Sequence, residues 1–438
     1  MAWPSRHHNQ GNHMKTPNFL ASLALAAGLA CTATAHAQTT QYQLFDIGQL
    51  SPGDGMYATG INNSGQVSGY AYTNGFNGWS SVGDYRAFST GANGSGVTAL
   101  GTLGGSWSKA YGINDAGQVV GTAQTAGGSF HAFLRGSTGP MQDLGTLGAV
   151  NSIATAINAS GQVIGRTGGG PFSSDPDSLD PQQGFITDAN GQAMRSLGSL
   201  NGQPLFGNGL NDAGRVVGHI GFSELNQAGT FVTGANGSAP VALPAAVHYQ
   251  ESSINNAGQI AGTYIGPQDQ IGRNAYIGND SGTVKPLDFS HVANYAQGNL
   301  GGSGQYGPAS FSDTAGINEF GQVAGTIHNL RFGRDFAFIT GANGQGVIDV
   351  NSLFTLADGD WFRTVTGIND QGQFVVNSGY GHAYLISPIP EPATLALWGV
   401  GLLLIGGAAR RRINAATGSA GRPTATAQSL RAAMPMPC

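Results

Sequence analysis

The sequence predicts an all-β fold, a seven-bladed β-propeller, and three observations support this prediction. A ten-residue motif recurs seven times, each copy is followed by further short strands, and one spare strand precedes the first copy. Gly112 to Gly121, with the sequence Gly-Ile-Asn-Asp-Ala-Gly-Gln-Val-Val-Gly, is a clear copy. From Asn to Asn the copies lie 44 to 63 residues apart, which indicates an array of one supersecondary unit.

The composition indicates an ordered, turn-rich protein. The chain has 438 residues, of which 72 are Gly and only 9% are charged, yet it carries enough large apolar residues to bury a core. The formal net charge of −5 argues against nucleic-acid binding. Both cysteines, Cys31 and Cys438, fall outside the predicted folded region, which therefore has neither a disulfide nor thiol chemistry.

The N-terminus has the pattern of a secretory signal peptide over residues 1–37. A lysine precedes the apolar run Phe19 to Ala30, and small residues follow it where a signal peptidase cuts. The polar residues 1–13 are expected to lie upstream of the true start, and lipidation of Cys31 is the alternative for this region. The residues that define the predicted cleavage site are Ala35, Ala37 and Gln38.

Each copy of the motif predicts a β-hairpin. The Asn that begins the turn can accept hydrogen bonds from the backbone that follows it, and the Gly three residues later can adopt positive φ. Asp115, Asp212 and Asp370, directly after that Asn, are expected to be exposed turn residues rather than calcium ligands. The residues of the seven turns are Asn62, Gly65, Asn114, Gly117, Asn158, Gly161, Asn211, Gly214, Asn255, Gly258, Asn318, Gly321, Asn369 and Gly372.

Two further strands are expected in each repeat. In the second copy His131 to Leu134 is the third strand and Asp143 to Leu147 the fourth. Asn-Gly pairs between these strands favour a tight reversal, so the fourth strand should pair with the third. The Asn-Gly turns begin at Asn93, Asn190, Asn236 and Asn343. The other fourth strands are Ala99 to Leu103, Ser196 to Leu200, Val241 to Leu243, Val284 to Leu287 and Ile348 to Leu353.

The strand count predicts how the array closes. After the last third strand, His382 to Leu385, the chain reaches Pro388 without a fourth strand. The spare segment Tyr42 to Leu50 resembles Asp143 to Leu147, so it can complete the last blade and close a ring over residues 38–387. A solenoid of hairpins is the alternative fold.

The C-terminus predicts a membrane segment over residues 388–412. Pro390, Glu391 and Pro392 precede an apolar run from Ala393 to Ala409, which is long enough for a transmembrane helix. Three arginines follow and should stay in the cytoplasm, with the repeats outside. Those arginines are Arg410, Arg411 and Arg412, and the remaining tail, residues 413–438, is expected to be disordered.

This C-terminus resembles the PEP-CTERM sorting signal, and the repeats resemble the HAF family of extracellular repeats, named for the pattern found here at His131-Ala132-Phe133. The first resemblance implies export, a transient inner-membrane anchor with the repeats in the periplasm, processing by an exosortase-type enzyme, and then the cell surface or an extracellular matrix. It also implies a link to exopolysaccharide or biofilm. The HAF resemblance implies a surface location and no particular activity.

No motif of a known catalytic site, cofactor or metal site occurs, and His131 and His382 occupy a strand position that other residues fill elsewhere. The remaining candidates for a site interrupt the repeat, namely His248, Glu251, Asp175 to Asp180 and His291 to Phe311. Aromatic loop residues are candidates for stacking on sugars, namely Tyr72, Phe76, Trp79, Tyr85 and Trp107.

We therefore expect an exported, non-catalytic surface or matrix protein without cofactors, which binds extracellular polysaccharide or surface proteins. The alternative is a polysaccharide lyase or hydrolase with its site in the central channel of the propeller.

Overall fold

The computed structural model describes residues 40–72, 84–169, 180–221, 229–243, 252–265, 273–292, 310–329 and 333–389. The chain divides into the units Met1–Tyr42 and Gln43–Cys438, and the sheets belong to the second apart from the first residue of strand β1. The predicted signal peptide, membrane helix and tail lie outside the described residues, as does the predicted sorting segment from residue 390 on. The first residue of that segment, Pro388, instead ends strand β29 (Ala383–Pro388). Within the described ranges, no helix has the length and hydrophobicity needed to cross a membrane.

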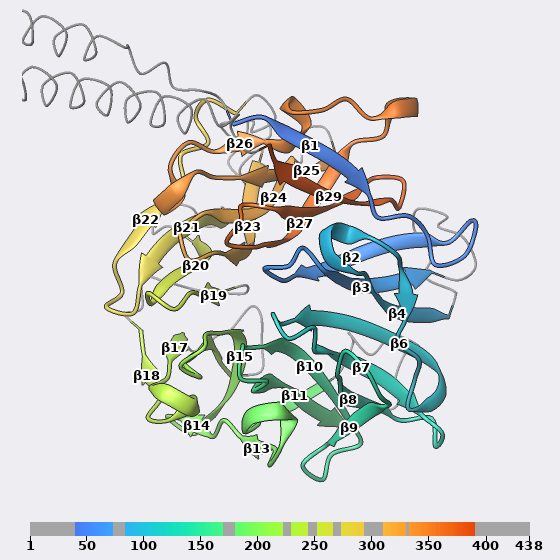
Figure 1. The fold of residues 1–438 in the computed structure, drawn as a ribbon. Coiled ribbons are helices and arrows are strands. Elements are labelled where there is room, and N and C mark those ends of the chain that lie inside the picture. The colour runs from blue at the N-terminus through green and yellow to red at the C-terminus, as the bar shows by residue number, and fades with distance from the viewer. Residues whose placement is uncertain are drawn as a thin grey trace, which may run out of the picture. The chain divides into compact units, whose positions relative to one another are not determined.

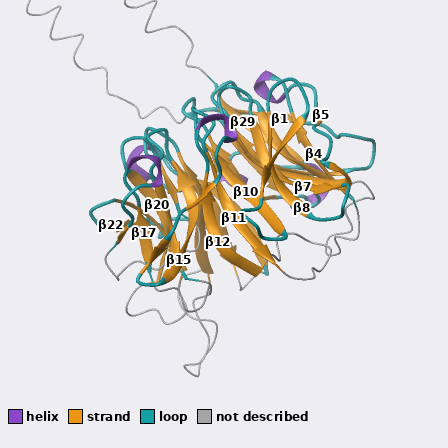
Figure 2. Cartoon of the chain, turned by 90° about the horizontal axis from the view of Figure 1, so that it is seen from below, coloured by secondary structure: helices purple, strands orange, loops and turns teal. Residues whose placement is uncertain are grey.

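The described residues form seven antiparallel sheets around a common centre, so the prediction of a seven-bladed β-propeller is confirmed (Figure 1). Strands and loops dominate, and the helical turns are short (Figure 2). Blade one consists of β2 (Gly55–Ile61), β3 (Val67–Tyr72), β4 (Tyr85–Ser89) and β5 (Thr98–Ala99). Blade two consists of β6 (Gly104–Ile113), β7 (Val119–Thr125), β8 (Phe130–Arg135) and β9 (Met141–Gly145). Blade three consists of β10 (Asn151–Ile157), β11 (Val163–Gly169), β12 (Asp180–Ile186) and β13 (Arg195–Ser196).

Blade four has five strands and the other blades have four. Blades four to seven consist of β14 (Ser199–Leu200), β15 (Gln203–Leu210), β16 (Val216–Ile220), β17 (Thr230–Val232) and β18 (Val241–Ala242); β19 (Ser253–Ile254), β20 (Gln259–Ile265), β21 (Arg273–Asn279) and β22 (Val284–Pro286); β23 (Ser310–Ile317), β24 (Val323–Asn329), β25 (Arg334–Ile339) and β26 (Ile348–Asp349); and β27 (Phe362–Ile368), β28 (Phe374–Ser378), β29 (Ala383–Pro388) and β1 (Tyr42–Asp46). The 3-10 turns are η1 (Ala92–Gly94), η3 (Ala189–Gly191), η4 (Ala235–Gly237), η5 (Ala342–Gly344), η6 (Val350–Ser352) and η7 (Ala357–Gly359).

The ring is closed at its centre and at its outer edge. The innermost strands are β2, β6, β10, β15, β19, β23 and β27; each contacts the next, and β27 contacts β2. At the outer edge β1 pairs with β29 of blade seven, and the N–H of Ile47 donates to the carbonyl of Ala383 at 3.1 Å. The N-terminal strand thus completes the last blade as predicted, and the alternative of an open solenoid is wrong.

The outermost strands end earlier than the sequence indicated. Gly101, Gly145 and Gly198 have φ of 88°, 86° and 85°, which turns the backbone out of extended geometry where the predicted strands continue. Ser199–Leu200 pairs instead with β15 of the next blade. The stretch from Ile348 keeps only two strand residues before a 3-10 turn, and β6 is longer than the predicted strand.

A β-bulge recurs in the innermost strand of six blades. In blade one the pairing with β3 shifts between Ala58 and Gly60, so Thr59 is the extra residue. Such a bulge re-aims the side chain of the extra residue. The residues at the equivalent shifts are Thr59, Tyr111, Thr155, Asn208, Ala315 and Thr366.

The last Gly of the motif permits close packing inside the blade. Gly69 lies opposite Phe88, and a Cβ at Gly69 would overlap the carbonyl oxygen of Tyr57 on the innermost strand. Gly121 and Phe133 repeat this arrangement in blade two. The Phe side chains are fully buried and belong to apolar clusters that span neighbouring blades, so packing between blades supplies the core.

Candidate functional site

The repeated turns form the inner rim of the propeller at the ends of the innermost strands. In blade one, Oδ1 of Asn62 accepts the N–H groups of Ser64 at 3.0 Å and Gln66 at 2.9 Å. Gly65 has φ of 70°, and the Gly of every turn has φ between 69° and 79°. These side-chain and backbone bonds fix the same turn in all seven blades.

The seven turn asparagines also join one blade to the next. Nδ2 of each donates to the carbonyl oxygen of the corresponding Asn in the following blade, at 2.9 to 3.2 Å. The seventh bond runs from Asn369 to Asn62 at 2.9 Å and completes the circle. All seven side chains are buried, which distinguishes them from ordinary exposed turn residues.

A second circle of hydrogen bonds lies one residue further along each turn. The N–H of Asn63 donates to Oδ1 of Asp115 at 2.8 Å, and equivalent backbone-to-side-chain bonds join the other blades except where Ala159 offers no acceptor. Both circles line a cavity of about 190 Å³. The expectation that Asp115, Asp212 and Asp370 are exposed in turns holds for the first two, but all three carboxylates also bind neighbouring blades.

In four blades the Gln of the motif contacts the Asn-Gly turn of the next blade. Nε2 of Gln118 donates to Oδ1 of Asn190 at 3.1 Å, and Gln259 donates to Asn343 at 3.0 Å. In these Asn-Gly turns the Asn adopts φ of 52° to 55°. The hydrogen bonds made by the polar side chains of the motif therefore join neighbouring blades.

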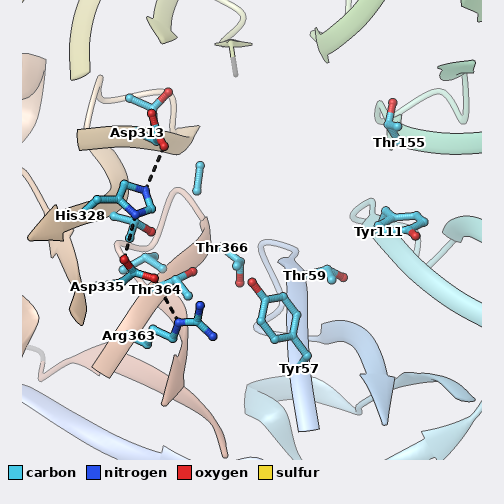
Figure 3. Close-up of a pocket in the computed structure, with 14 residues that line it drawn as sticks. Tyr57, Thr59, Tyr111, Thr155, Asp313, His328, Asp335, Arg363, Thr364 and Thr366 are labelled. Atoms are coloured by element: carbon cyan, nitrogen blue, oxygen red, sulfur yellow. Dashed lines mark hydrogen bonds and ion pairs between the residues drawn. The ribbon is translucent and has the colours of Figure 1, made fainter. Parts of the chain in front are cut away.

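A larger cavity, of about 590 Å³, lies nearer the N-terminal ends of the innermost strands (Figure 3). Five of the six bulged residues line it, and Tyr57 adds an aromatic ring. The hydroxyl of Thr59 donates to the carbonyl of Ala110 at 3.0 Å, and that of Thr155 donates to the carbonyl of Ile164 at 3.3 Å. Because these hydroxyl protons serve the backbone, their oxygens remain available as acceptors.

Four charged side chains meet on one wall of this cavity. Nε2 of His328 lies 2.9 Å from Oδ2 of Asp313, and Nδ1 lies 2.9 Å from Oδ1 of Asp335. Nε of Arg363 donates to the other oxygen of Asp335 at 3.2 Å (Figure 3). This network of side-chain bonds runs Asp313–His328–Asp335–Arg363. It joins β23, β24 and β25 of blade six to β27 of blade seven.

This network shifts the pKa values of His328 and Asp335. Burial lowers the pKa of His328, but the hydrogen bonds to Asp313 and Asp335 outweigh burial and raise it to about 9. Burial tends to raise the pKa of Asp335, yet the bonds from His328 and Arg363 hold it below its usual range. At neutral pH His328 is therefore a cation between two carboxylates.

The aromatic residues of blades one and two have a different role from the one expected. Tyr85 and Trp107 are buried strand residues, 4% and 5% exposed, and Tyr72 belongs to β3. Nζ of Lys109 lies 4.4 Å from the ring centre of Tyr85 and 5.3 Å from that of Trp107. The rings of Tyr85 and Trp107 therefore lie against a buried lysine and do not form exposed loop platforms for sugars. Phe76 and Trp79 lie outside the described residues.

The other predicted candidates do not meet at one place. His131 pairs with Asp143 of its own blade at 2.7 Å, and His291 bonds the carbonyl of Val347 at 2.9 Å. Glu251, His248 and most of 175–180 lie outside the described residues, as do the predicted cleavage and sorting residues. Over the described ranges, no three His, Cys, Asp or Glu side chains are grouped to hold a metal ion.

The cavity and its charged wall were not predicted from the sequence. His328 stands where the other blades carry Tyr72, Gln124, Gly168, Gly221, Ile265 or Gly379, and Asp313 stands where they carry mostly uncharged residues. An alignment of the repeats strand by strand shows that blade six places charges at both positions. Arg363 had no such signal, because it lies at an additional register shift in β27.

No family model matches the sequence, and no curated protein matches it. Among solved structures, the chain is similar to YCF48 bound to a peptide, with 10% identity, 80% of this chain and 96% of that chain covered, and a TM-score of 0.48. It is also similar to the β-propeller domain of the trilobed protease from Pyrococcus furiosus, with 9% identity, coverage of 76% and 95%, and a TM-score of 0.48. The chain is similar to puromycin hydrolase as well, with 10% identity, 76% of this chain and 53% of that chain covered, and a TM-score of 0.44. Likenesses of this size carry no argument about function, and the assignment as a propeller rests on the order of the strands in its sheets.

Proposed function

We propose that this protein is an exported, non-catalytic surface or matrix protein whose propeller binds a saccharide in the cavity of about 590 Å³. The observation that carries the proposal is the lining of that cavity, where threonine hydroxyls, two tyrosines and a charged network converge at the bulges of the innermost strands. A volume of this size lies within the range of roughly 300 to 1,000 Å³ that is usual for small-molecule sites.

The polar lining suits a ligand that is rich in hydroxyl groups. Thr59 and Thr155 present oxygen acceptors, because their protons are donated to backbone carbonyls. Tyr57 and Tyr111 bring aromatic faces to the same space, and such faces pack against the apolar C–H face of a sugar ring. A saccharide combines the hydroxyl donors and the apolar faces that this lining complements.

Export to the surface is supported by the sequence rather than by the described residues. The signal-like segment 1–37 and the sorting-like segment 388–412 together favour passage through the inner membrane and processing by an exosortase-type enzyme. We expect Glu391→Ala to leave unprocessed protein in the inner membrane, measured by cell fractionation. Unchanged release of the variant would exclude this route.

A glycan array followed by calorimetry tests saccharide binding. We expect binding by the wild-type protein and a loss of about tenfold in affinity for Tyr57→Ala, which removes an aromatic contact. Tyr380→Ala is the matched control, because Tyr380 is 53% exposed and does not line the cavity. An array without any binder, or equal losses in both variants, would contradict saccharide binding in the cavity.

A polysaccharide lyase or hydrolase is the second candidate, and the position of His328 between two carboxylates at the cavity wall favours it. With a pKa of about 9, however, His328 is a proton donor at neutral pH and not a base. Turnover of matrix polysaccharide that Asp313→Asn or His328→Gln abolishes would establish an enzyme. Binding without turnover would favour the non-catalytic function.

A further inference from the structure

Arg363 differs from the other residues of the cavity wall in how it is held. Its Nε donates to Oδ2 of Asp335 at 3.2 Å, Oδ1 of the same carboxylate bonds His328, and His328 bonds Asp313. Each side chain of this network is held in place by its bond to the next one. The guanidinium is therefore oriented before any ligand arrives, which lowers the entropic cost of using it for recognition.

The backbone of β27 places Arg363 on the cavity. Side chains of a regular strand alternate between two faces, yet Arg363, Thr364, Val365 and Thr366 all line this space. Two register shifts against β28, one between Phe362 and Thr364 and one between Val365 and Gly367, account for this. The sheet gives up regular pairing at the point where the guanidinium enters the cavity.

The outer edge of the guanidinium is open. Among the described residues only Nε has a hydrogen-bond partner, and the side chain is 45% exposed. Its terminal nitrogens are directed away from Asp335, toward the part of the cavity where Tyr57 and Thr366 lie (Figure 3). Two adjacent N–H donors in a rigid plane match the two oxygens of a carboxylate.

The charges on the wall argue against an anion with two charges. The two carboxylates of the network are balanced by the imidazolium of His328 and the guanidinium of Arg363. A single carboxylate would shift this balance by one unit only, whereas a doubly charged phosphate would leave a larger uncompensated charge beside Asp335. The same space offers acceptors for sugar hydroxyls, notably Thr59 and Thr155.

We infer that Arg363 binds the carboxylate of an acidic sugar, so that the ligand of the cavity is a saccharide of the uronic-acid type. This inference rests on the proposed saccharide binding and adds the chemical class of the ligand. Arg363 provides two hydrogen bonds to the carboxylate, the chain Asp313–His328–Asp335 holds the guanidinium in place, and hydroxyl oxygens of the lining accept from the sugar.

Calorimetry on the full-length chain in detergent tests this, with trigalacturonate and the same trisaccharide after reduction of its carboxylates to neutral alcohols. We expect the acidic sugar to bind about tenfold more tightly, because a charge-assisted pair contributes more than a neutral hydrogen bond. Arg363→Gln should abolish this preference, by weakening the binding of the acidic sugar to the level of the neutral one. Arg363→Lys should restore only part of it, since lysine keeps the charge but not the planar pair of donors.

Arg135→Gln is the matched control, because Arg135 lies on β8 and does not line the cavity. If the wild-type protein binds both sugars equally, or if Arg363→Gln keeps the preference, the inference about the carboxylate is wrong while saccharide binding stands. If neither sugar binds to the wild-type protein, the inference about the acidic sugar fails, and the glycan array decides separately whether the cavity binds another saccharide. Comparing the two sugars on the wild-type protein does not depend on how any variant folds.

Discussion

The two ends of the innermost strands differ in regularity. At the end that carries the repeated turns, seven asparagines make the same bond to the next blade, and one of these bonds joins the last blade to the first. Nearer the N-terminal ends of the same strands, the residues that line the larger cavity change from blade to blade, and charged side chains gather at blades six and seven. Uniform residues hold the ring together, and the residues that differ between blades are free to form a ligand site.

The largest expected effect separates buried turn residues from exposed ones. Asn255 is buried, bonds Asn318 in the next blade and accepts the N–H of Gln259, whereas Asn256 is exposed. Asn255→Ala should lower the free energy of unfolding by about 3 kcal/mol, because buried partners lose their bonds. Asn256→Ala should cost about 1 kcal/mol or less. Urea denaturation of the two variants measures this, and equal losses would show that the buried circle has no special role.

The charged wall should make stability depend on pH. Because the folded pKa of His328, about 9, lies above the ordinary value of 6.5, its contribution is complete below pH 6.5 and is lost as the pH rises through 9. The contribution is on the order of 2 kcal/mol once partial exposure is taken into account. His328→Gln should therefore destabilise the protein at about pH 6 and have little effect at about pH 10, measured by urea denaturation. An equal loss at both pH values would contradict the charged state of His328.

The aromatic enclosure of Lys109 should contribute less. Lys109→Met keeps the apolar stem and removes the ammonium from the faces of Tyr70 and Tyr85, so we expect a loss of about 1 kcal/mol in the free energy of unfolding. Lys285→Met, at an exposed position in β22, is the control and should be neutral. A thermal melt of both variants distinguishes them, and two neutral substitutions would mean that the ammonium adds nothing to the packing of the rings.

The smallest effect concerns the gap in the second circle. Ala159→Asn would supply a side-chain acceptor for the N–H of Asp115, as Asn256 does for Asp212 in the neighbouring part of the circle. Because the site is exposed, the gain should be about 0.5 kcal/mol at most. Ala116→Asn, in the same kind of turn but one residue further along, should show no gain. A destabilised Ala159→Asn would mean that the gap is required by the local geometry.

The fold could be predicted from the sequence because its signals are local and repeated. Asn114 and Gly117 specify a turn by themselves, and the unpaired segment near Tyr42 shows how the ring closes. The cavity could not be predicted in this way. Asp313, His328 and Arg363 meet only because neighbouring strands and a neighbouring blade bring them together, and a sequence does not show the bulges that turn side chains toward the centre.

The asparagine circle also bears on how the protein unfolds. An open array of repeats can lose its terminal repeats one at a time, since each end has a single neighbour. Here Asn369 bonds Asn62 as every other blade bonds its neighbour, and β1 lies beside β29. No blade is terminal, so opening any one of them requires two interfaces to separate at once. The first and last residues of the propeller should therefore unfold together with those in the middle of the chain, and not before them.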